Sequence, residues 1–111
     1  MATRYGQECP IARALGVIGE KWSLLVLRDL LRKGPLRFQE LEAGLEGVAP
    51  NTLSARLKTL ESKGVIASRL YEHHPPRFEY FLTDKGRALG PVLEALNRWG
   101  SATTKNVAPF S

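Results

Sequence analysis

The chain has 111 residues, of which 43% are hydrophobic and 24% are charged, and its formal net charge at pH 7 is +5. This size and composition predict one globular domain with a real hydrophobic core and exclude a two-domain protein. No apolar run approaches the about 18 residues of a membrane span, and the N-terminus lacks the apolar core of a signal peptide. We therefore expect a cytoplasmic protein without a membrane partner.

The positive charge is concentrated in one part of the chain. Residues 50–77 contain five Lys or Arg and two Glu, whereas residues 34–49 contain one Arg and three Glu. A basic segment favours an anionic polymer as partner, although a modest positive excess also serves solubility.

Two helices are expected in the first third of the chain. Pro10 suits the first helical position because it has no N–H to leave unpaired, and Ile11, Leu15 and Ile18 follow at helical spacing. From Glu20 to Lys33 the apolar residues continue nearly all the way round a helix. This second helix should therefore be buried at the centre of the core.

A helix-turn-helix is expected next. Gly34-Pro35 ends the central helix, and Leu36 to Phe38 can form a short extended piece. Residues 39–45 predict a brief helix, and residues 50–63 predict a longer amphipathic one after a turn that contains Gly47. Two helices joined by a short Gly-containing turn, the second with a polar outer face, form a helix-turn-helix.

The helix at 50–63 has two different faces. Leu53, Leu57 and Leu60 form a stripe that requires a core, and Arg56 lies at the border of that stripe. The opposite face carries small or hydrogen-bonding side chains and one cation: Asn51, Thr52, Ser54, Ala55, Lys58 and Thr59. Such a face suits a DNA major groove, where base edges offer donors, acceptors and methyl groups. An ordinary solvent-exposed helix is the alternative.

A β-hairpin should follow this helix. Residues 65–71 and 77–82 have the composition and alternation of strands, and the Pro-rich segment 73–76 predicts a polar turn between them. An isolated hairpin is marginally stable in water, so this one must pack on the helices. A hairpin directly after the second helix of a helix-turn-helix is a wing.

The C-terminal part predicts a further helix with an apolar stripe. Thr83 and Asp84 indicate its start, Gly90-Pro91 should kink or restart it, and Gly100 should end it. The stripe consists of Leu89, Val92, Leu93, Leu96 and Trp99. We expect a domain over residues 9–100, with a flexible arm at 1–8 and a frayed tail at 101–111.

The order of these elements, with six motifs, resembles the HxlR-type family of bacterial winged helix-turn-helix transcription regulators. The motifs are Cys9-Pro10, residues 19–22 (GEKW), 34–41 (GPLRFQEL), 53–61 (LSARLKTLE), 75–80 (PPRFEY) and 82–86 (LTDKG). The resemblance implies a mainly α fold with a small β-hairpin. It also implies a DNA-binding regulator, expected to be a repressor, at the bacterial nucleoid.

The resemblance further implies a homodimer in which the first and last helices pair across a two-fold axis. Its interface would contain Ile11, Leu15, Leu89, Val92, Leu93, Leu96 and Trp99. Two recognition helices related in this way would read an imperfect palindrome in double-stranded DNA. Alternatively, the apolar stripe folds back on its own subunit.

The implied DNA contacts divide into three groups. Base edges and adjacent phosphates would be contacted by Asn51, Thr52, Ser54, Ala55 and Lys58. The DNA backbone would be contacted by Arg56 and Thr59. The wing would reach the minor groove or phosphates through His73, His74 and Arg77, supported by Arg69 and Arg37.

Three features of the sequence complicate this assignment. Ala49 stands where the family often has a capping Ser, so Asn51 is a candidate for part of that cap rather than for base contact. Arg77 has a competing role in an ion pair with Glu72 or Glu79. The histidine pair at the wing tip differs from the usual family residues and can make binding depend on pH.

Cys9 is the single cysteine, so an intramolecular disulfide is excluded. Ahead of Pro10 it would lie at a helix N-terminus, where the helix dipole and the nearby Arg13 or Lys21 favour a thiolate. Several HxlR-type regulators sense quinones, hypochlorite or aldehydes through a cysteine at this place. The resemblance thus implies a redox or electrophile sensor, in which Cys9 either bridges the two subunits or carries a mixed disulfide or adduct. A buried packing cysteine is the alternative.

The sequence contains no motif that is typical of an enzyme. It has no Gly-rich phosphate loop and no nucleophile with a His and an acid around it, so we expect neither an enzyme nor a cofactor. A metal site would depend on Cys9 and two adjacent histidines that point apart, and we expect none. A winged-helix protein-interaction module and a regulator with a non-covalent small-molecule effector remain alternatives.

Overall fold

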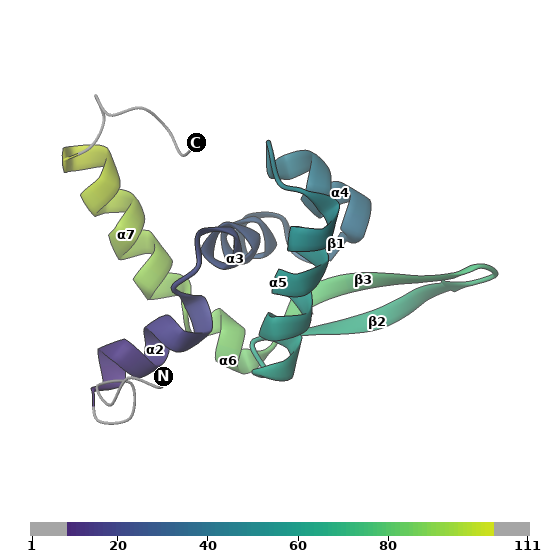
Figure 1. The fold of residues 1–111 in the computed structure, drawn as a ribbon, viewed down its shortest axis with the longest axis horizontal. Coiled ribbons are helices and arrows are strands. Elements are labelled where there is room, and N and C mark those ends of the chain that lie inside the picture. Colours follow the sequence, from purple (N-terminus) through teal and green to yellow (C-terminus); the bar gives the residue numbers. More distant parts are fainter. Residues whose placement is uncertain (1–8, 104–111) are drawn as a thin grey trace.

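The computed structural model describes residues 9–103, in which a small antiparallel sheet extends from one side of a cluster of helices (Figure 1). The helices are α2 (Pro10–Ile18), α3 (Lys21–Lys33), α4 (Phe38–Gly44), α5 (Pro50–Ser62), α6 (Asp84–Arg87) and α7 (Gly90–Thr103). The strands are β1 (Leu36–Arg37), β2 (Ile66–His73) and β3 (Pro76–Leu82). The predicted fold class, mainly helical with a small β part, is confirmed. None of the helices in this part of the chain is long and apolar enough for a membrane span.

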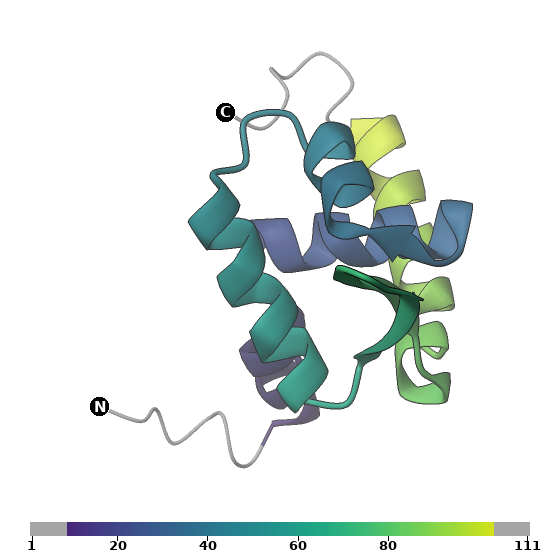
Figure 2. The same cartoon turned by 90° about the vertical axis from the view of Figure 1, so that its right-hand side faces the viewer.

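Helix α3 lies at the centre of the molecule, as its apolar pattern predicts (Figure 2). Val26, Leu27 and Leu30 are buried, and the buried Leu57 of α5 and Leu41 of α4 belong to the same core. Glu20 caps the start of α3, because its carboxylate accepts hydrogen bonds from the backbone N–H groups of the first turn. At the other end Gly34 adopts a positive φ of 81°, which a residue with a side chain rarely adopts.

The sheet has the strand order β1-β3-β2, so the predicted short extended piece is a third strand. Leu36 pairs with Tyr80 of β3, and both other strands are longer than the sequence pattern indicates. Glu72 pairs with Arg77 and His73 with Pro76, so the ladder continues to the tip and leaves only His74-Pro75 as the turn. The hairpin of β2 and β3 points away from the helices (Figure 1).

The C-terminal helical region is interrupted at Gly90-Pro91, as expected, because α6 ends before this pair and α7 begins at it. Thr83 accepts a hydrogen bond from the backbone N–H of Gly86 and so caps α6. The predicted end at Gly100 is wrong, since α7 continues to Thr103. One glycine lowers helix propensity without removing any backbone hydrogen bond, so the helix passes through it. The proposed arm at 1–8 lies outside the described residues. Of the proposed frayed tail at 101–111, residues 101–103 belong to α7 instead, and the rest lies outside the described residues.

Candidate nucleic-acid interface

Helices α4 and α5 form the predicted helix-turn-helix. The turn between them spans residues 45–49, and within it Leu45 and Val48 are buried while Gly47 takes a φ of 90°. These two apolar side chains pack in the core and so hold the turn, and with it the start of α5, in place. Figure 2 shows α5 along one side of the molecule, next to the hairpin that projects toward the viewer.

The leucine stripe of α5 is buried, and its polar face is turned outward. Leu53, Leu57 and Leu60 are at most 2% exposed. On the other face Asn51, Ser54 and Lys58 are exposed, whereas Thr52, Ala55 and Thr59 are half-buried. Among residues 9–103 the side chains of these six make no hydrogen bond or ion pair with another residue. Their donors and acceptors are therefore available to another molecule.

The start of α5 has no side-chain cap. Ala49 occupies the capping position, as expected, and no side chain bonds the free N–H groups of the first turn. Asn51 does not supply this cap, so its amide does not have a competing intramolecular role in the described chain. The uncapped N–H groups lie at the positive end of the helix dipole, an arrangement suited to a phosphate.

Arg56 lies at the border of the two faces, as the helical spacing predicts. Its side chain is half-buried, and its Nε is buried without a hydrogen-bond partner among the described residues. A buried donor without a partner costs about 1–3 kcal/mol of desolvation. Contact with DNA through the rest of its guanidinium remains a prediction.

The basic residues of the hairpin have different surroundings. Arg69 donates from Nε to Glu79 over 2.6 Å, and its guanidinium lies 4.9 Å from the centre of the Phe81 ring. Arg77 faces Glu72 at 3.8 Å, with both side chains about half exposed. Of the two ion pairs considered for Arg77, only that with Glu72 forms. Because exposed pairs contribute only about 0–1 kcal/mol, Arg77 can exchange this partner for a phosphate.

A cleft of about 280 Å³ separates the base of α4 from the hairpin. Arg37 forms part of its wall and stacks 4.3 Å from the centre of the Tyr71 ring, while its backbone N–H donates to Glu40. Phe78 also lines the cleft and remains 49% exposed. Its cross-strand partner is Leu70, which is exposed as well.

Sequence reasoning missed these apolar residues of the hairpin. Phe78 alternates with Arg77 and Glu79, which places it on the inner face of the hairpin together with buried Leu82. The length of the strands was the signal. When a hairpin extends beyond the helices, the residues near its tip have no core to cover them, even on the face that is buried nearer the base. His73 and His74 lie exposed at the tip, as expected.

Helices α2 and α7 lie on the side of the molecule opposite the hairpin (Figure 1), and both carry exposed apolar side chains. Ile11 and Leu15 of α2 are 72% and 57% exposed, and none of the described residues of α7 is buried. The exposed apolar side chains on α7 are Val92, Leu96 and Trp99. By contrast, Leu89 and Leu93 are half-buried against the subunit's own core. Only this part of the stripe folds back; we name the five exposed residues of α2 and α7 the apolar face.

Cys9 is exposed at the N-terminal cap of α2 and makes no side-chain hydrogen bond to that helix. The alternative of a buried packing cysteine is therefore wrong. Within residues 9–103 no three His, Cys, Asp or Glu side chains are grouped so that they could hold a metal ion.

The sequence matches a family model over most of its length. Residues 17–108 fit the model described as HxlR-like helix-turn-helix. The chain belongs to this family. It is a helix-turn-helix transcriptional regulator that binds DNA, and the expectation that it is not an enzyme is confirmed by its relatives, which are regulators.

Two relatives and two solved structures illustrate the similarity. The chain is 38% identical to the HTH-type regulator BH0655 of Halalkalibacterium halodurans, covering 90% of this chain and 88% of that protein. It is 44% identical to the regulator sll1512 of Synechocystis, covering 86% and 70% respectively. The redox regulator HypR in its reduced form matches with a TM-score of 0.79 and 31% identity, over 84% of this chain and 91% of HypR. Reduced YodB from Bacillus subtilis gives a TM-score of 0.74 and 28% identity, over 90% and 98%. These neighbours confirm the winged-helix architecture.

Proposed function

We propose that this HxlR-like regulator is a homodimeric repressor that binds an imperfect palindrome in duplex DNA. Each subunit would place α5 in a major groove and its hairpin at the adjacent minor groove. The observation that carries this proposal is the outer face of α5, whose six small or polar side chains have no partner in the described chain. Its complement is a surface with hydrogen-bonding groups and negative charge, which duplex DNA presents.

The exposed side chains of each subunit indicate which residues would contact the DNA. Asn51, Ser54 and Lys58 are the exposed residues of α5 and would reach base edges and phosphates, with Thr52, Ala55 and Thr59 beside them. Arg37 and Arg77 line the cleft between α4 and the hairpin and would bind the phosphates that run past it. Phe78 would pack against the sugar edges of the minor groove, as apolar side chains of minor-groove binders do.

The apolar face supports a dimer. A monomer would leave these five large apolar side chains exposed to water, and exposed apolar side chains of this kind mark an interface. A second copy is the occupant that fits it, because a two-fold axis lets the same patch cover itself. The axis then turns both α5 helices toward the same side of a duplex. A dimer that occupies a promoter in this way represses by competing with RNA polymerase for the same DNA.

The exposure of Cys9 supports a further part of this proposal, in which oxidants act on the dimer through its thiol. Cys9 precedes by two residues the apolar face residue Ile11, so a change at its sulfur alters the edge of the dimer interface. In the proposed step two Cys9 thiols, one from each subunit, lose two electrons and two protons to an oxidant and form one S–S bond. With diamide as oxidant, its N=N bond gains both electrons and both protons and becomes a hydrazine.

Fluorescence anisotropy tests the proposal. The full chain is titrated onto the duplex upstream of its own coding region and onto a scrambled duplex, first with dithiothreitol and then with diamide. We expect selective binding whose logarithmic affinity falls linearly with the logarithm of the salt concentration. Diamide should change this affinity in the wild type and leave Cys9→Ser unchanged. Equal sensitivity of both proteins to diamide would refute the Cys9 switch, and absence of DNA binding at low salt would refute the regulator's proposed mode of action.

A further inference from the structure

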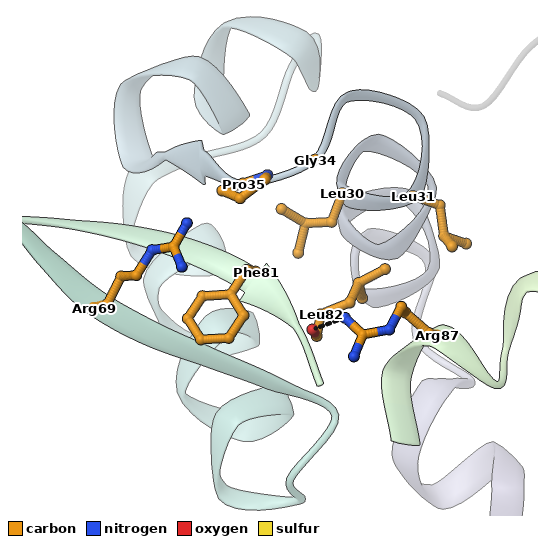
Figure 3. A pocket seen from close by; sticks show the side chains of 8 residues that line it. All are labelled: Leu30, Leu31, Gly34, Pro35, Arg69, Phe81, Leu82 and Arg87. Atoms are coloured by element: carbon orange, nitrogen blue, oxygen red, sulfur yellow. Dashed lines mark hydrogen bonds between the residues drawn. The ribbon is translucent and has the colours of Figure 1, made fainter. Parts of the chain in front are cut away.

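A second cavity, of about 370 Å³, lies on the other face of the hairpin base (Figure 3). Its apolar wall is formed by Leu30 and Leu31 at the end of α3 and by Phe81 and Leu82 at the end of β3. Two arginines, Arg69 of β2 and Arg87 of α6, reach it from opposite sides of Phe81 and Leu82. Of the residues that line it, only Arg69 is also expected to support the DNA contacts of the hairpin.

The two arginines differ in how much of their hydrogen-bonding capacity is used. Arg87 donates from Nη1 to the carbonyl oxygen of Leu82 over 2.9 Å and from Nη2 to Asp84. Arg69 uses only Nε, toward Glu79, and its two terminal nitrogens have no hydrogen-bond partner among residues 9–103. An arginine presents a planar fork of N–H donors that matches a carboxylate in two places. Arg69 therefore offers such a fork at the rim of an apolar cavity.

We propose that this cavity binds a small aromatic monocarboxylate. The ring would lie on the apolar wall beside Phe81, and the carboxylate would accept hydrogen bonds from the terminal nitrogens of Arg69. The volume falls within the range of about 300–1,000 Å³ that small-molecule sites in proteins occupy.

The surroundings select a single negative charge on an apolar body. Glu79 and Asp84 stand beside the two arginines, so their carboxylates would repel a doubly charged phosphate. A neutral ligand of the same shape would leave the free donors of Arg69 without a charged acceptor. The apolar wall would leave a small hydrated ion with too little contact.

The position of the cavity connects the two functional parts of the molecule. Its walls come from α3, from the base of the hairpin and from α6, which leads directly into α7. Leu31 also lies against the start of α7. If Gly90 carried a Cβ atom, that atom would lie 3.8 Å from Cδ2 of Leu31. A bound carboxylate would hold the hairpin base against the segment that carries the apolar face. This regulatory role rests on the proposed function, because it links a ligand to operator affinity.

Isothermal titration calorimetry of the full chain without DNA tests the site, with benzoate as probe and benzamide as its neutral isostere. We expect one benzoate per chain, and at least about tenfold weaker binding of benzamide because it lacks the charge that pairs with Arg69. Arg69→Gln should weaken benzoate binding by a similar factor. The matched control is Arg98→Gln, which removes an exposed, ion-paired arginine of α7 and should leave benzoate binding unchanged.

A second variant keeps the test independent of the hairpin's ion pair. Leu31→Trp fills the cavity from the α3 side at a half-buried position, so it should abolish benzoate binding while the circular dichroism spectrum stays that of the wild type. No benzoate binding at millimolar concentration, equal binding of benzamide, or unchanged binding in Arg69→Gln would each overturn the site.

The effect on DNA separates this inference from the proposed function. With benzoate at saturation, operator affinity should change at least about threefold in the wild type, because coupling between two sites is reciprocal. It should stay constant in Leu31→Trp, because this variant should not bind benzoate. Benzoate binding without any operator binding would refute the proposed function and leave the site intact. Operator binding that ignores bound benzoate would refute the regulatory role of the cavity.

Discussion

Helices α5 and α7 are of similar length and are both amphipathic, but they expose opposite faces. In α5 the leucines are buried in the core, and the surface consists of small polar side chains. In α7 none of the described residues is buried, and Trp99 is 64% exposed. A helix that exposes its polar face is complete within its subunit and can bind a polar partner. A helix that exposes its apolar face is suited to contact with a second protein surface.

The largest expected effect concerns α7. Trp99→Glu places a charge in the apolar face, so we expect a monomer in analytical ultracentrifugation at concentrations where the wild type is a dimer. Operator affinity should fall on the order of 100-fold, because each half-site then binds separately. The control is Asn97→Glu, which adds the same charge at an exposed polar position of the same helix. A dimer that survives Trp99→Glu would remove the distinction between the two helices.

The next effect concerns α5. Lys58→Ala should weaken operator binding about tenfold and, for a dimer, reduce the slope of log affinity against log salt by about two. The control is Arg98→Gln, which removes one positive charge on α7, opposite the hairpin. An equal loss of affinity in both variants would mean that total charge, and not the face of α5, determines binding.

A smaller effect is expected at the hairpin. Phe78→Ser should lower operator affinity by about threefold to tenfold without changing the salt slope, because an apolar contact with sugars releases no counterions. Arg77→Gln should instead reduce the slope. Since Phe78 is 49% exposed, the melting temperature should remain that of the wild type. A changed slope in Phe78→Ser would contradict the apolar contact.

The smallest effect is expected where the hairpin meets α5. Burial, and then the negative charge of Glu61, raise the pKa of Tyr80 above 10.0. The folded state therefore favours the neutral phenol, and its contribution to stability is fully present below pH 10 and lost as pH rises through the raised pKa. Melting curves between pH 9 and 11 should show a smaller loss of stability in Tyr80→Phe than in the wild type. Parallel curves would contradict this assignment.

The sequence predicts those features that follow from helical periodicity. The stripe of Leu53, Leu57 and Leu60 identified the buried side of α5, and the nearly continuous apolar residues of α3 identified the centre of the core. In both cases the spacing of apolar residues along one helix is enough to determine which side of the helix is buried. The restart at Gly90-Pro91 follows equally directly, because proline lacks the N–H that a helix interior uses.

Other features depend on contacts between distant segments. The ladder of Glu72 with Arg77 extends the hairpin, and that extension decides that Phe78 is exposed rather than buried. The choice of Glu72 as partner of Arg77, with Arg69 on Glu79, follows from the strand register and a bulge near Leu70. The periodicity of one segment predicts neither the length of the paired strands nor the partners of their ion pairs. The cavity at Arg69 and Arg87 likewise combines α3, β2, β3 and α6, whose packing no local pattern specifies.

The central claim is that two α5 helices, related by a two-fold axis, read one operator. Selection of binding sequences from a random duplex library by the full reduced chain tests this claim and requires no assumed operator sequence. We predict enrichment of an imperfect palindrome whose half-sites are one helical turn, about 10 base pairs, or a multiple of it apart. Enrichment of a single unsymmetrical site, or of no sequence at all, would contradict it.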